Sequence, residues 1–137
     1  MGPKNKPFSE MKVEDLSFEI EFFESLSKRD TKDLRVLEIL AHYYTKSGLI
    51  TEGLRVDRRI VRHDPKNPVA HYNLACSLAL KNRKKDAVES LRDAVERGYN
   101  DVDWMIRDSD LENLRKYTPF LELVRKVENE AEGQEDF

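Results

Sequence analysis

Residues 64–80 have the sequence DPKNPVAHYNLACSLAL, which predicts a turn followed by an amphipathic helix. Asn67 can accept hydrogen bonds from the open N–H groups of a helix start. Pro68 comes next, and the fixed φ and missing N–H of proline suit the first position of a helix. The apolar residues then recur with helical spacing, at Val69, Leu74, Ala75 and Leu78.

Helix starts and stops recur along the chain with a period of 34 residues. A shift of that length aligns Asp33, Asn67 and Asp101, which are all residue types that cap a helix start. The same shift pairs Gly48 with Asn82, the two residue types that most readily adopt the left-handed conformation after a helix end. The sequence therefore predicts structural repeats of one fixed length.

Apolar residues follow helical spacing between these starts and stops. In the first helix of one repeat they are Leu34, Leu37, Leu40, Ala41 and Tyr44. In the two second helices they are Leu54, Val56, Ile60 and Val61, and then Ala87, Val88, Leu91, Ala94 and Val95. A segment near the start has the phase of a second helix, with Leu16, Ile20, Phe23 and Leu26. We expect each repeat to be a helical hairpin, preceded by half a repeat.

Antiparallel helix pairs with this period are the signature of the tetratricopeptide repeat, and the chain resembles that family. Small residues occupy the family's close-contact positions at Ala41, Ala75, Gly53 and Ala87. The resemblance implies an all-α, right-handed solenoid of helical hairpins, with a half repeat, two full repeats and a helical cap. We expect a single domain over 9–131, comprising the half repeat 13–33, repeats 34–67 and 68–101, and capping helices 102–131. The termini, 1–8 and 132–137, are expected to be disordered.

Composition narrows the class of protein. The chain has 137 residues, a net charge of −3 and 37% charged residues. It contains no apolar run long enough for a membrane helix, so no membrane association is expected. The net charge lacks the basic excess of a nucleic-acid-binding protein, so we expect no nucleic acid partner. The single Cys76 fits a reducing compartment, and we expect a cytoplasmic protein.

The resemblance places function on the concave surface, which the first helix of each hairpin lines. One half of this groove is polar and the other largely apolar, and we expect it to bind a peptide or a partner protein. Tyr72 is the leading candidate contact, because an exposed aromatic ring offers a large contact area. The alternative is that the capping tail fills the apolar half. The candidate groove residues are Arg35, Glu38, His42, Lys46, Val69, Tyr72, Asn73, Cys76 and Leu80.

The sequence gives less support to a catalytic or metal-binding site than to a partner-binding groove. His42 and Cys76 occupy equivalent positions on neighbouring first helices and are the one thiol–base pair that the register allows on the concave face. The sequence shows no orienting acid or glycine-rich oxyanion turn beside them, and two ligands are too few for a metal site. We therefore expect no enzymatic activity, no metal and no cofactor.

Two polar residues replace the apolar consensus inside the stack, Asp57 and His71. The repeat register places them opposite each other, where a second helix packs on the following first helix. We expect them to form a hydrogen-bonded structural pair.

The sequence thus predicts a protein-interaction module without chemistry of its own. Self-assembly into a homo-oligomer through the exposed ends of the stack is the first alternative. RNA binding is the second, and it rests only on the basic cluster at residues 81–85.

Overall fold

The computed structural model describes residues 15–135, and for residues 134 and 135 it describes the backbone alone. The predicted disordered segment 1–8 lies outside the described residues. No described helix is long and apolar enough to cross a membrane.

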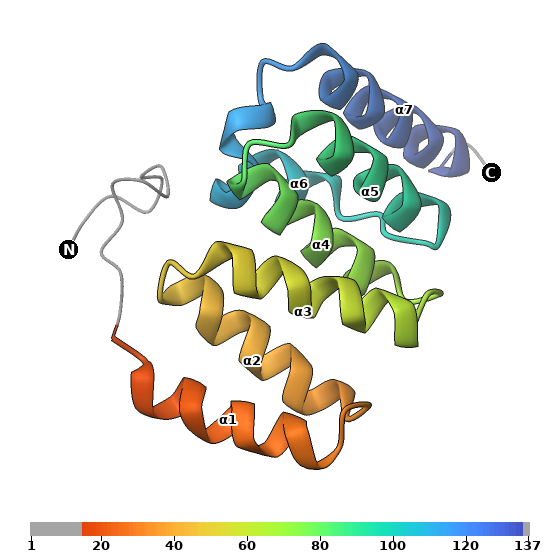
Figure 1. Ribbon diagram of the computed structural model, residues 1–137. Helices are drawn as coiled ribbons and strands as arrows, with labels where there is room; N and C mark the ends of the chain where they lie inside the picture. The colour runs from red at the N-terminus through yellow and green to blue at the C-terminus, as the bar shows by residue number, and fades with distance from the viewer. Residues whose placement is uncertain (1–14, 136–137) are drawn as a thin grey trace.

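Within the described range all regular secondary structure is helical, as predicted. Neighbouring helices pack as antiparallel layers, and the stack runs from α1 at one end to α7 at the other (Figure 1). The elements are α1 (Ser17–Arg29), α2 (Leu34–Lys46), α3 (Ile50–His63), α4 (Pro68–Leu80), α5 (Lys84–Glu96), α6 (Val102–Arg107), the 3₁₀ helix η2 (Ser109–Leu114) and α7 (Thr118–Glu135).

The predicted helix caps are present. The carboxylate of Asp33 accepts hydrogen bonds from the first turn of α2, and the side-chain oxygen of Asn67 does the same for α4. Asp101 caps α6 through the backbone N–H of Trp104. The predicted stops are also confirmed, because Gly48 and Asn82 have φ values of 78° and 60°, in the left-handed region. These positions fix the length of both full repeats.

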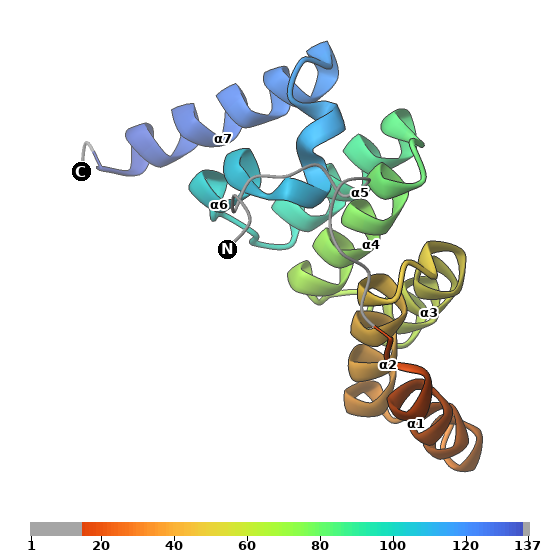
Figure 2. The ribbon, with the colours of Figure 1, turned by 90° about the vertical axis from the view of Figure 1, so that its left-hand side faces the viewer.

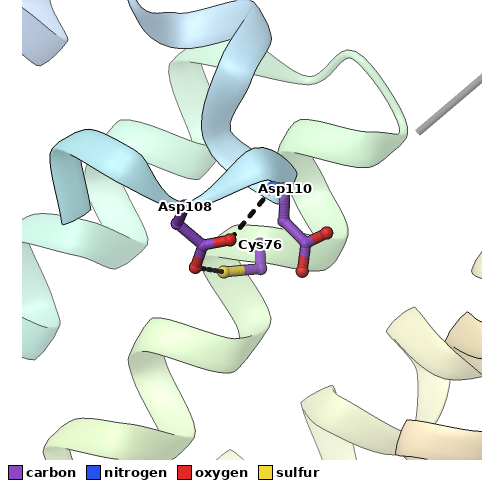
Figure 3. A group of neighbouring side chains, drawn as sticks. All are labelled: Cys76, Asp108 and Asp110. Carbon is purple, nitrogen blue, oxygen red and sulfur yellow. Dashed lines mark hydrogen bonds between the residues drawn. The ribbon is translucent and has the colours of Figure 1, made fainter. Parts of the chain in front are cut away.

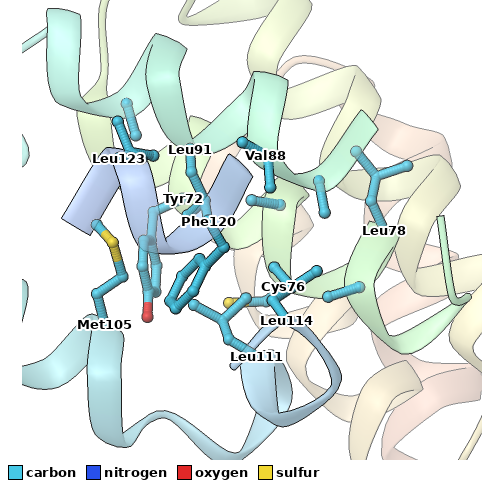
Figure 4. Packing of buried hydrophobic residues seen from close by; sticks show 14 of the residues in the cluster. Tyr72, Cys76, Leu78, Val88, Leu91, Met105, Leu111, Leu114, Phe120 and Leu123 are labelled. Atoms are coloured by element: carbon cyan, nitrogen blue, oxygen red, sulfur yellow. The ribbon is translucent and has the colours of Figure 1, made fainter. Parts of the chain in front are cut away.

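The larger hydrophobic core joins the second full repeat to the cap (Figure 4). Ala75, Val88 and Leu91 of the repeat are buried in the same cluster as side chains of the cap. The contributing cap residues are Met105, Leu111, Leu114, Phe120, Leu123, Val124 and Val127. A smaller core joins α1 to the first full repeat through Ile20, Leu37, Leu40 and Ile60.

The cap differs from the predicted capping helices in two respects. Residues 109–114, where we expected an ordinary helix, form a 3₁₀ turn that the Asp108 carboxylate caps through the backbone N–H of Asp110. Helix α7 continues to Glu135, past the predicted boundary at residue 131, because Glu and Ala in this segment favour helix. Figure 2 shows the C-terminal half of α7 extending beyond its neighbours.

Substitution of Phe120 tests whether the cap is part of the core. Phe120 is 2% exposed within the larger core, so Phe120→Ala should lower the free energy of unfolding by about 3–5 kcal/mol. Leu121, the next residue on α7, is 45% exposed, and Leu121→Ala should cost less than about 1 kcal/mol. Urea unfolding followed by circular dichroism measures both. Equal, small losses would show that the cap is not packed as described.

Candidate partner-binding groove

The concave side of the stack contains a hollow of about 270 Å³ between the first full repeat and the cap. Its walls come from α2, α3 and α4, and the cap closes it with Trp104, Asp108 and Asp110. The cap therefore forms part of the groove.

Six of the nine predicted groove residues are exposed on the concave helices: Arg35, Glu38, His42, Lys46, Val69 and Asn73. Of these, Glu38, His42 and Asn73 line the hollow itself. The other three lie on the apolar half of α4 and are covered: Tyr72 and Cys76 are buried, and Leu80 is half-buried. The cap fills this half of the groove, which was the alternative left open by the sequence.

Tyr72 is a core residue, so its prediction as an exposed anchor is wrong. Its hydroxyl donates a hydrogen bond of 2.6 Å to Asp108 Oδ2, and its ring stacks on Tyr99 with centroids 4.4 Å apart. Only 4% of the residue is exposed. Burial of the apolar ring and the hydrogen bond to the buried Asp108 both hold Tyr72 against the cap. Loss of the ring is therefore expected to destabilise the fold.

Cys76, Asp108 and Asp110, which all line the hollow, lie close together (Figure 3). The thiol donates a long hydrogen bond, 3.7 Å, to Asp108 Oδ2, and one ligand atom from each residue lies within 4.8 Å of the others. The three could therefore offer a cation three ligands. However, burial and the nearby carboxylates raise the pKa of the Cys76 thiol well above its usual range, which favours the neutral thiol. The thiol bonds Asp108 and not the exposed His42, so the thiol–base pair that the register allowed is not formed.

Asp57 and His71 have separate partners, so the predicted mutual hydrogen bond is wrong. Ser77 Oγ donates to Asp57 Oδ2 at 2.5 Å, whereas His71 Nε2 lies 2.7 Å from the carbonyl oxygen of Pro65. The reason is geometric: His71 sits in the first turn of α4 and reaches back to the preceding turn. Asp57 instead faces α4 further along, where Ser77 offers a hydroxyl.

The charge of the hollow is acidic. Glu38, Asp57, Asp108 and Asp110 line it, and no Lys or Arg lies among the lining residues of the described chain. Burial raises the pKa of Asp57 to about 7, although the Ser77 hydrogen bond opposes this shift. Burial, followed by repulsion from Asp108, raises the pKa of Asp110 to about 6. Both raised pKa values mean that burial in the hollow disfavours the ionised form of these two carboxyl groups.

Trp104 supplies an apolar wall beside these carboxylates, and 48% of it is exposed. The sequence analysis named neither Trp104 nor the two cap carboxylates as site residues, because the repeat phase ends at Asp101. The one available signal was the run of Asp residues that follows the last repeat.

Comparison with known proteins supports the fold. No family model matches the chain. The crystal structure of MamA, a tetratricopeptide-like helical protein, superposes with a TM-score of 0.59 over 86% of this chain and 90% of MamA, at 15% sequence identity. The fold is tetratricopeptide-like.

A curated relative adds a sequence match. The chain is 28% identical over 114 residues to a chloroplastic protein of Arabidopsis thaliana. The match covers 80% of the chain but 34% of the plant protein, so the chain spans about a third of that protein's length.

Asp57→Asn tests the electrostatic cost of the buried carboxylate. The folded pKa of about 7 lies above the ordinary 3.8, so the folded state binds more protons between these values. The stability associated with Asp57 is therefore full at low pH and is lost as pH rises towards 7. At each pH, the quantity of interest is the free energy of unfolding of Asp57→Asn minus that of the wild type. This difference should be larger at pH 8 than at pH 5, by roughly 1–3 kcal/mol.

Urea unfolding at the two pH values measures this difference. Glu89→Gln, on the exposed side of α5, is the control and should show no such change. If the Asp57→Asn difference is the same at both pH values, the assignment of the raised pKa is refuted.

Proposed function

We propose that the chain is a protein-binding module whose concave groove holds a partner segment by a lysine or arginine side chain. The observation that carries this proposal is the charge of the hollow: four carboxylates line it, and no Lys or Arg among the described lining residues offsets them. A partner's cation would supply the missing positive charge.

The walls of the hollow suit a long cationic side chain. The half-exposed indole of Trp104 offers an aromatic face for the alkyl stem or the charged group. Asp110 is half-buried, and Glu38 lies at the exposed rim, so the carboxylates extend from the opening to the interior. A charge pair in this partly desolvated hollow is stronger than the same pair in water.

Asn73 gives the groove a means of holding the partner's main chain. It lies on α4 beside the hollow, its side chain is exposed, and its amide can both donate to and accept from a peptide backbone. The partner would thus be an extended segment with one cationic anchor. The same acidic charge repels phosphate, so this surface gives no support to RNA binding.

The raised pKa values make the affinity depend on pH. At pH 5 the carboxyl groups of Asp57 and Asp110 are largely protonated, because their pKa values are about 7 and about 6. Ionisation at higher pH increases the attraction for a cation, and the bound cation in turn favours ionisation. Affinity should therefore rise between pH 5 and pH 8.

Trp104 is the single tryptophan of the chain, so its fluorescence reports binding at the groove directly. Peptides selected from a random display library against the full chain serve as ligands and should share a lysine or arginine. Changing that residue to glutamine, or Asp110→Asn in the protein, should weaken binding about tenfold or more. Glu89→Gln on α5 is the control and should bind normally.

Two results would overturn the proposal. One is selection of acidic or uncharged peptides that quench Trp104 fluorescence as strongly as basic ones. The other is unchanged affinity in Asp110→Asn, or an affinity that falls as pH rises.

A further inference from the structure

Helix α3 carries a stripe of arginines on the convex side of the stack, away from the groove. Arg55, Arg58 and Arg62 are exposed, and Arg59 is half-buried and donates to the carbonyl oxygen of Thr31. We refer to these four residues as the arginine stripe. Their spacing places them on one face of the helix over about 10 Å. Within the described chain, none of the four forms an ion pair with a described carboxylate.

The end of α7 has the opposite charge. Residues 128–135 include Glu128, Glu130, Glu132 and Glu135 and no basic residue, and we refer to this segment as the acidic end. Residues 128–133 are all exposed, which means that this part of the helix has no packing partner among the described residues. Val127, immediately before them, is buried and anchors α7 to the stack.

We propose that the chain self-associates head to tail, with the acidic end of one copy lying along the arginine stripe of the next. The spacing of the two charged segments supports a second copy as the occupant. Glu128, Glu132 and Glu135 are separated by four and then three positions, as are Arg55, Arg59 and Arg62. Arg55, Arg58 and Arg62 are separated by three and then four positions, which is the reverse order. The charged residues of the two helices can therefore pair whether the helices run parallel or antiparallel.

The two segments of a single chain are held apart. Helix α7 packs on α5 and α6 at the far end of the stack, and α4 and α5 separate it from α3 (Figure 1). Contact therefore requires a neighbouring copy. The two surfaces differ, so the contact is heterologous and repeats from copy to copy. It also leaves the concave groove open, so this inference does not rest on the proposed function.

Exposed ion pairs are individually weak and are screened by salt. The assembly should therefore grow with protein concentration at low ionic strength and dissociate at about 0.5 M salt. Sedimentation velocity on the full chain, after nuclease treatment, measures this directly. A chain that remains monomeric at every concentration in low salt would refute the inference.

Charge reversal identifies the surfaces. Arg58→Glu with Arg62→Glu should abolish assembly, and so should Glu128→Lys with Glu132→Lys, because reversing two of its four charges leaves one of the two segments with no net charge. An equimolar mixture of the two variants should assemble again, since each altered segment finds its complement on the other protein. Lys85→Glu with Arg92→Glu, on exposed positions of α5, makes the same change in net charge as the first variant and should leave assembly intact.

Circular dichroism verifies that each variant is folded. Assembly that survives either reversal, or a mixture that stays monomeric, would overturn the inference. If assembly occurs in untreated protein and disappears after nuclease treatment, the arginine stripe binds a nucleic acid. That result would also overturn the inference of self-association.

Discussion

Helix α4 must be covered on both of its long faces, and the rest of the structure follows from this requirement. Its buried residues include Ala75 and Leu78 on the side of the neighbouring hairpin helices and Tyr72 and Cys76 on the concave side. Helices α3 and α5 cover the first side, and η2 packs against α4 as part of the cap. Exposure of this apolar surface to water would cost several kcal/mol, at about 25 cal/mol per Å². The cap is thus needed to complete the fold.

Coverage of α4 also determines the chemistry of the groove. Asp108 accepts a hydrogen bond from the Tyr72 hydroxyl, and Asn113 Nδ2 donates to the carbonyl oxygen of Ala79 at 2.7 Å. These contacts fix the cap in register, which places Trp104 and Asp110 opposite α2 and turns an open concave surface into a small acidic hollow. Positive charge collects on the opposite side, on α3. The two proposed interactions, with a cationic segment inside and an acidic helix outside, rest on this separation of charge.

The repeat architecture could be predicted from sequence because its determinants are local. Asp33 and Asn67 cap helices within their own first turn, and Gly48 and Asn82 end helices through their own φ values. The position of Tyr72 could not be predicted from periodicity, because a residue on the concave face is exposed or buried according to what the non-repeating tail does. The hydrogen-bond partner of Asp57 was predicted wrongly for a similar reason. The repeat register identifies the helix that faces Asp57, but it does not show which turn of that helix the side chain reaches. The site residues of the cap lie beyond the last repeat, where no periodic signal remains.

Hydrogen–deuterium exchange of the full chain, resolved by residue, tests most directly whether the cap and α4 form one cooperative unit. We predict that amides of α4 and of the buried cap residues Leu111, Phe120, Leu123 and Val124 exchange at the same slow rate, through global unfolding, while residues 128–133 exchange rapidly in dilute protein. Exchange of the cap segment that is much faster than that of α4 would mean that the cap detaches from a stack that stays folded. Tyr72 would then be exposed in an open groove, and the acidic hollow would not be the resting state of the protein.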